Sequence, residues 1–228
     1  MKRYITTVAA SSLLAALTVV AVPAKADIVI YDSYPKQTSG SNTNIENFGG
    51  VPGAGGYPGG DAYGNTITFD GTARDLTTVL IGLGDGGGNF GTATLYLYAG
   101  ANPNGAQLLG SANVNVPSGI DPAISVDFTS QNIVLPDTIT FVIRGPNGAD
   151  GVVTSASGPS IGTGPNSFWF EPTAGTFTAN STWAISDGAN NNYMVAQFNA
   201  TVPDGGTTLA LLGLVIAGMA GLRRKLSL

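Results

Sequence analysis

Few side chains in this chain could do chemistry, because it contains neither histidine nor cysteine. Their absence excludes disulfide bridges, thiolate and imidazole metal sites, cysteine nucleophiles and every catalytic triad built on histidine. Catalysis would then need a pair of carboxylates, as in glycoside hydrolases. Glu46 and Glu171 are the only glutamates, and their separation in space cannot be read from the sequence. We therefore expect a protein that is not an enzyme, with a secreted glycoside hydrolase as the least favoured alternative.

A second candidate is the segment Asp85-Gly86-Gly87-Gly88-Asn89. Carboxylate, amide and carbonyl oxygens are the ligands that Ca²⁺ prefers in proteins. The segment lacks the acid spacing of an EF-hand and the repeat of a calcium-binding β-roll, so a glycine-rich hairpin is the favoured interpretation. We expect no cofactor, with calcium as the one cation worth testing.

Aromatic residues offer a third kind of site. Phe168, Trp169 and Phe170 form a cluster, and Trp183 follows shortly after. Such rings could stack on sugars, which makes a carbohydrate-binding module at the cell surface the main alternative function. Aromatic side chains fill protein cores more often than they bind ligands, so core packing is the favoured interpretation.

The C-terminal segment 202–228 combines three features that indicate targeting rather than folding. An apolar stretch, 207–222, would form a helix of about 24 Å, slightly short of a ~30 Å hydrocarbon core. A proline-glycine motif precedes this stretch and a basic cluster ends it, and positive charge keeps that end cytoplasmic. The motif is Val202, Pro203, Asp204, Gly205 and Gly206, and the basic stop is Arg223, Arg224 and Lys225.

This three-part tail resembles the PEP-CTERM class of bacterial sorting signals, and its motif is closest to the Val-Pro-Asp-Ser-Gly variant. Gly205 stands in place of the serine, and Asp204 stands where the main class has glutamate. The resemblance implies that an exosortase handles the tail. A plain C-terminal membrane anchor without processing is the alternative. Pro203 fixes φ and the two glycines free the backbone, which favours an extended, accessible peptide outside the membrane.

The N-terminal segment 1–26 is typical of a secretory signal peptide. Lys2 and Arg3 precede an uncharged apolar stretch, and Ala24-Lys25-Ala26 fits the small-x-small cleavage pattern. The mature chain would then begin at Asp27, after export by the Sec machinery.

Once both ends are set aside, residues 27–201 carry three basic residues against thirteen acids, a net charge of −10. Such a domain repels nucleic acid and anionic headgroups, so we expect no nucleic-acid partner.

The exported part, 27–201, shows period-two alternation of apolar residues and no helical period, which predicts β-strands. Ile139, Phe141 and Ile143 alternate with Thr140 and Val142, for example. Short strands separated by turn signals predict one antiparallel β-sandwich, jelly-roll-like, between the signal helix and the transmembrane helix. About ten strands are expected, near 27–31, 62–69, 76–83, 92–99, 107–116, 124–128, 138–144, 151–156, 166–170 and 193–200.

The order of these segments loosely resembles the bacterial choice-of-anchor domains, which are secreted β-sandwiches with varied sorting tails. The stretch from Thr66 to Phe69 and the stretch from Ala93 to Tyr98 carry the likeness, together with Leu135 to Ile143. We therefore expect an exported cell-envelope or extracellular-matrix protein, held transiently in the membrane by 207–222. The resemblance implies a structural or adhesive role in exopolysaccharide or biofilm.

Overall fold

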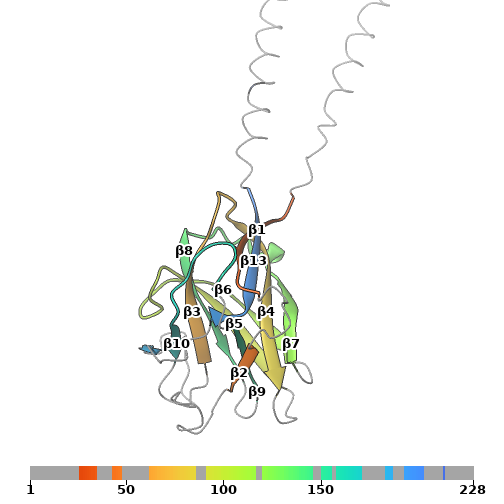
Figure 1. Cartoon of the computed structure of the whole chain (residues 1–228). Helices are drawn as coiled ribbons and strands as arrows, with labels where there is room; N and C mark the ends of the chain where they lie inside the picture. The colour runs from red at the N-terminus through yellow and green to blue at the C-terminus, as the bar shows by residue number, and fades with distance from the viewer. Residues whose placement is uncertain are drawn as a thin grey trace, which may run out of the picture. The chain divides into compact units, whose positions relative to one another are not determined.

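The structure is a computed structural model that describes residues 26–34, 43–47, 62–85, 91–116, 120–145, 150–155, 158–170, 183–186, 193–202 and 213. Residues Asp27–Pro203 form one compact unit. Its described elements are strands and one short 3₁₀ turn, η1 (Thr129–Gln131). The unit is built from two antiparallel sheets that pack face to face (Figure 1).

The first sheet is organised around β4 (Asp75–Asp85), its longest strand. One edge of β4 pairs with β7 (Ile120–Asp127). The other edge pairs with β13 (Ala196–Thr201) and then, beyond Ile81, with β9 (Asp150–Ser155). On their far sides β13 pairs with β1 (Ile28–Asp32), and β9 pairs with β2 (Thr43–Asn47). The short β12 (Tyr193–Met194) also pairs with β9. The sheet therefore forks at this point: β12 lies beside β9, whereas β13, which follows β12 in the chain, lies beside β4.

The second sheet has six described strands in the spatial order β11-β10-β3-β8-β5-β6. Its centre is the pair β3 (Ala62–Thr68) and β8 (Thr138–Arg144), which are in register over all seven residues. The outer strands are β5 (Thr92–Ala99) and β6 (Leu108–Asn115) on one side, and β10 (Phe168–Phe170) and β11 (Ala184–Ser186) on the other.

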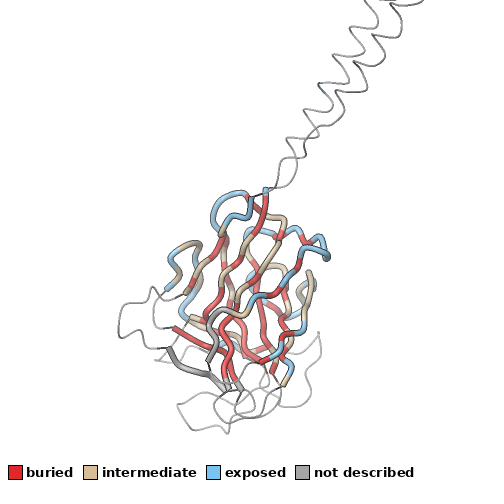
Figure 2. Tube along the Cα trace, turned by 90° about the vertical axis from the view of Figure 1, so that its right-hand side faces the viewer, coloured by how far each residue is buried: buried red, intermediate tan, exposed pale blue. Residues whose placement is uncertain are grey.

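The core lies between the sheets, as the buried segments in Figure 2 show. The alternation predicted from the sequence is confirmed here: Ile139, Phe141 and Ile143 are buried in the core from β8. Phe198 of β13 meets Phe141 edge-on, with ring centroids 5.5 Å apart. Burial of apolar area is the main stabilising contribution to such a fold, at about 25 cal/mol per Å².

The last strand breaks at Val195, between β12 and β13, and side chains satisfy the backbone groups on both sides of the break. Asn65 of β3 accepts a hydrogen bond from the N–H of Met194 through Oδ1. The hydroxyl of Ser33 donates to the carbonyl of Met194 at 2.8 Å and accepts from the N–H of Ala196 at 2.9 Å. Because unpaired buried backbone groups are costly, Asn65 and Ser33 make the fork in the sheet possible.

A short segment, 160–163, links the two sheets along one side. Ile161 forms a β-bridge with Asp32 of the first sheet, and Thr163 forms one with Thr68 of the second. Gly162, between them, has φ of +75°. A Cβ built on Gly162 would lie 2.7 Å from the carbonyl oxygen of Thr68 and 3.0 Å from Tyr31, so only glycine fits this approach.

Most of the sequence-based assignment is confirmed: the protein is all-β, its sheets are antiparallel, and every predicted strand has a counterpart. Three details were wrong. The strands β2 and β11 were missed, and the predicted strand 193–200 is two strands separated at Val195. The jelly-roll connectivity stays a prediction. The predicted signal helix and transmembrane helix lie outside the described residues, apart from Gly213, and within those residues no helix is long and apolar enough to span a membrane.

Candidate functional site

The sorting motif begins where the last strand ends. Ala200 of β13 pairs with Ile28 on one side and with Leu76 on the other. Thr201 pairs with Asp75, and its carbonyl accepts a 3.1 Å hydrogen bond from the N–H of Arg74. Thr201 is only 4% exposed, whereas Val202 is 49% exposed. The backbone is therefore held on both edges at Ala200 and on the β4 edge at Thr201, and Val202 is exposed.

The first and last strands of the sandwich lie side by side, because β1 is the direct neighbour of β13 (Figure 1). Directly opposed residues on antiparallel strands are about 5 Å apart. Ile28, two residues after the predicted signal-cleavage point, is such a neighbour of Ala200. Ala26 and Asp27 are both exposed, and Ala24 lies outside the described residues.

A turn from Asp70 to Arg74 crosses this end of the sandwich as the chain passes from β3 to β4. At its start the N–H of Asp70 donates to the carbonyl of Ile30 at 2.9 Å, and at its end Arg74 holds Thr201. The carboxylate of Asp70 accepts from the N–H of Gly71, which has φ of +66°. The turn therefore ties the first strand to the last.

The side chain of Arg74 contacts several neighbouring groups. Its guanidinium forms a 2.8 Å ion pair with Asp137 and donates to the carbonyl of Ala73 at 2.7 Å. The guanidinium carbon, Cζ, also lies 5.8 Å from the ring centroid of Phe69, within reach of a cation–π interaction. Because Asp137 is highly exposed, the ion pair itself contributes little stability.

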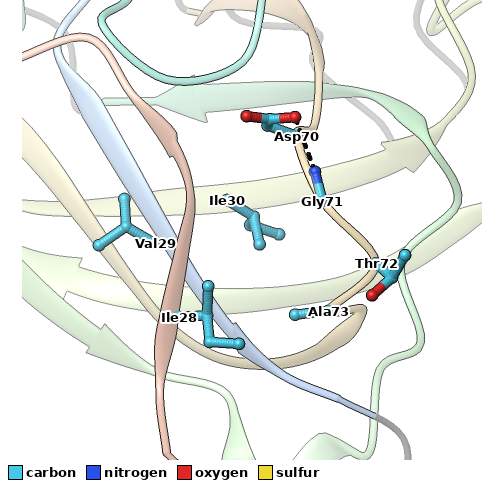
Figure 3. A pocket seen from close by; sticks show the side chains of 7 residues that line it. All are labelled: Ile28, Val29, Ile30, Asp70, Gly71, Thr72 and Ala73. Carbon is cyan, nitrogen blue, oxygen red and sulfur yellow. Dashed lines mark hydrogen bonds between the residues drawn. The ribbon is translucent and has the colours of Figure 1, made fainter.

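Between the turn and the first strand lies an open groove of about 280 Å³. Figure 3 shows its lining, in which Ile28 and Ile30 face Ala73 and Asp70 stands at one side. Ile30 and Ala73 are buried, whereas Ile28 is 45% exposed. We refer to this feature as the exit groove, and it is lined by Ile28, Val29, Ile30, Asp70, Gly71, Thr72 and Ala73.

The remaining residues of the predicted sorting signal lie outside the described residues. These are Pro203 to Gly206 of the motif and the basic stop Arg223 to Lys225. Sequence reasoning identified the motif but missed the exit groove beside it. An Asp-Gly pair is typical of a turn, so Asp70-Gly71 is a local sign of the turn, but nothing in the sequence places that turn next to Val202.

The side chains that the sequence analysis considered for catalysis or calcium lie outside the described part of the structure. Glu46 lies in β2 and Asp85 ends β4, but their side chains are not described, and Glu171 and Gly86 to Asn89 fall outside the described residues. No group of three or more acidic residues able to hold a metal occurs within the described ranges.

Two of the described carboxylates accept hydrogen bonds from residues two positions further along the chain. Asp127 accepts hydrogen bonds from the hydroxyl and the N–H of Thr129, which lower the pKa of its carboxyl. Asp32 accepts from the N–H of Tyr34. Both contacts are typical of turn residues, so these two carboxylates have a structural role.

Of the four aromatic residues proposed for sugar stacking, three are buried. Phe168 and Phe170 lie in the core, and Trp183 is covered on the outer face of the second sheet together with Tyr98. Trp169 is half-buried, and its indole N–H donates to Thr66 at 2.9 Å. This arrangement favours packing over ligand stacking for the cluster.

Comparison with known proteins finds one match. Residues 201–226 match the sequence model of the VPDSG-CTERM motif. The chain therefore ends in a PEP-CTERM-like C-terminal sorting signal. No curated protein and no solved structure matches the chain.

Proposed function

We propose that the protein is an exported component of the cell envelope or extracellular matrix, passed to an exosortase through its C-terminal signal. The match of residues 201–226 to a sorting motif carries this proposal. The fold supports it, because the domain closes at Thr201 and leaves Val202 exposed at the start of the motif. Residues 1–26 would direct export by the Sec machinery, and 207–222 would hold the chain in the membrane until the tail is processed.

The molecular role proposed for the sandwich is structural or adhesive, in contact with exopolysaccharide, and not enzymatic. Buried aromatic residues and carboxylates engaged in turns support this role over sugar stacking or hydrolysis. The net charge of −10 over residues 27–201 also favours neutral partners over anionic ones.

The test replaces Pro203 and Asp204 together with alanine in the full chain expressed in its native host. A sorting enzyme must bind the motif as an extended peptide, whereas a plain anchor needs only the apolar helix and basic stop. We expect the variant to insert into the membrane but to keep its tail, seen as a larger mass in the membrane fraction. The matched control replaces Pro165 and Asn166, an exposed proline-containing pair outside the motif, and should be processed like the parent. Equal processing of the Pro203/Asp204 variant would overturn the proposal in favour of a plain anchor.

A further inference from the structure

The distance available to a processing enzyme is short. Five residues, Val202 to Gly206, separate the last fixed residue, Thr201, from the apolar segment that begins at Thr207. Even a fully extended chain spans only about 20 Å over that stretch. Since a folded enzyme is larger than this gap, an enzyme that binds the motif beside the membrane also contacts the end of the sandwich from which the tail leaves, next to Thr201.

The surface that such an enzyme meets is the exit groove. Thr201 is hydrogen-bonded to Arg74, the residue directly after the groove-lining Ala73, so the motif leaves the sandwich next to the groove. The groove has a buried apolar floor of Ile30 and Ala73, and Ile28 offers a half-exposed apolar side chain above it.

The charge around the groove selects the kind of partner. Asp27 and Asp70 are exposed acids at this end, and the nearby cation Arg74 is already paired with Asp137. Anionic lipid headgroups are therefore repelled. A protein that presents an apolar side chain with a basic residue beside it fits the groove in both shape and charge.

We propose that the exit groove is a docking site for the membrane-embedded peptidase that processes the tail, separate from the motif that the peptidase cuts. This inference rests on the proposed function. The peptidase seats an apolar side chain against Ile28 and a cation near Asp70, and this contact holds the adjoining peptide in place for cleavage. Docking next to the cut raises the effective concentration of the motif at the active site.

The experiment follows tail processing in the full chain by pulse-chase labelling, with four variants in the native host. Ile28→Ser removes the exposed apolar contact, and Val134→Ser is the matched control, since Val134 is 61% exposed but does not line the groove. A flexible linker of about ten Gly and Ser residues between Thr201 and Val202 separates the intact motif from the groove. The fourth variant combines the linker with Ile28→Ser.

We expect Ile28→Ser to slow processing by about fivefold, in line with the loss of one aliphatic contact at an interface, and Val134→Ser to leave it unchanged. The linker alone should slow processing similarly, and Ile28→Ser should have no further effect in the linker background. Protease resistance of the sandwich in the membrane fraction checks folding, and N-terminal sequencing checks that the signal is still cleaved before Asp27.

Other outcomes overturn the inference in distinguishable ways. If Ile28→Ser and the linker variant are processed at the parent's rate, the groove does not dock the peptidase, and the proposed function still stands. If the processed protein sediments with vesicles of phosphatidylethanolamine and phosphatidylglycerol, and Ile28→Ser abolishes this, the groove binds lipid instead. If the parent's tail is never processed, both the inference and the proposed function fail.

Discussion

Asn65 of one sheet accepts a 2.8 Å hydrogen bond from the backbone N–H of Met194 in the other sheet, across the buried interior of the sandwich. The same amide donates to the carbonyl of Ser167 at 2.6 Å, so both ends of the side chain are used. Asn65 is 1% exposed. It therefore compensates for the break at Val195 that separates β12 from β13, and it joins three segments that are distant in sequence.

Replacing Asn65 with leucine should destabilise the protein by about 2–4 kcal/mol. The change keeps the approximate volume but leaves the Met194 N–H and the Ser167 carbonyl buried without partners, and each such group costs about 1–3 kcal/mol. The measurement is chemical denaturation of the mature protein. Asn115→Leu on the exposed part of β6 is the control and should change stability by less than about 0.5 kcal/mol. Equal effects of the two substitutions would show that the hydrogen bonds of Asn65 contribute nothing specific.

Gly162→Ala should destabilise the protein more than Gly71→Ala, although both glycines have positive φ. An alanine at either position adds about 1–2 kcal/mol of backbone strain. At Gly162 the new Cβ also meets the carbonyl of Thr68 at 2.7 Å, whereas at Gly71 nothing lies within 4 Å. The difference between the two variants, measured from their thermal midpoints, isolates the close approach of segment 160–163 to both sheets. A larger effect at Gly71 would contradict this account.

Sequence patterns predicted the features of the fold that neighbouring residues determine, such as the positions of most strands and the direction of their side chains. The alternation of Ile139, Phe141 and Ile143 predicts a strand that turns these three side chains to one face, because side-chain direction in a strand depends only on neighbouring residues. The break at Val195 depends on Ser33 and Asn65, which lie 161 and 129 residues from Met194. No window of sequence contains both partners, so the segment was predicted as one continuous strand.

The missed strand β2 and the exit groove have the same explanation. Thr43–Asn47 holds one apolar residue, Ile45, and becomes a strand because β9 offers it an edge. The groove arises where β1 and the Asp70–Ala73 turn meet. The sorting motif, in contrast, is contiguous in sequence, so its residues could be named from the sequence alone.

Stability should fall at strongly alkaline pH because of two buried tyrosines. Burial raises the pKa of Tyr31 and of Tyr98 to about 12, from 10.0. Below about pH 10 both hydroxyls are neutral in the folded and unfolded states, so they add no pH dependence. Between pH 10 and 12 the unfolded chain releases protons that the folded protein keeps, and unfolding becomes more favourable as pH rises.

For Tyr31 this linkage is worth about 2 kcal/mol by pH 12. Denaturation midpoints measured from pH 8 to pH 11.5 should therefore fall less steeply in Tyr31→Phe than in the parent, with the two curves parallel below pH 10. Parallel curves over the whole range would show that Tyr31 ionises equally easily in both states.

If residues 1–26 and 207–222 hold the chain in the membrane as proposed, the pairing of Ile28 with Ala200 predicts that the sandwich folds while both segments are still attached. The two ends leave the same end of the fold, so neither has to run back along its length. The strand β4 has eleven residues and spans about 35 Å. The chain would have to bridge that distance if its two termini left the sandwich at opposite ends. Folding therefore does not wait for removal of either targeting segment.

Replacing Ala24 and Ala26 with leucine blocks signal cleavage in this interpretation, because the small residues of the recognition pattern are lost. We expect the uncleaved protein to give the same protease-resistant fragment as the parent when membranes are digested from the outside, differing only by the retained N-terminal segment. A version with a flexible linker of about ten residues between Ala26 and Asp27 is the control. Because the ends already meet, the linker should give no gain in resistance. If the uncleaved variant is degraded and the linker restores resistance, membrane attachment at both ends strains the fold, and the adjacency of Ile28 and Ala200 does not serve export.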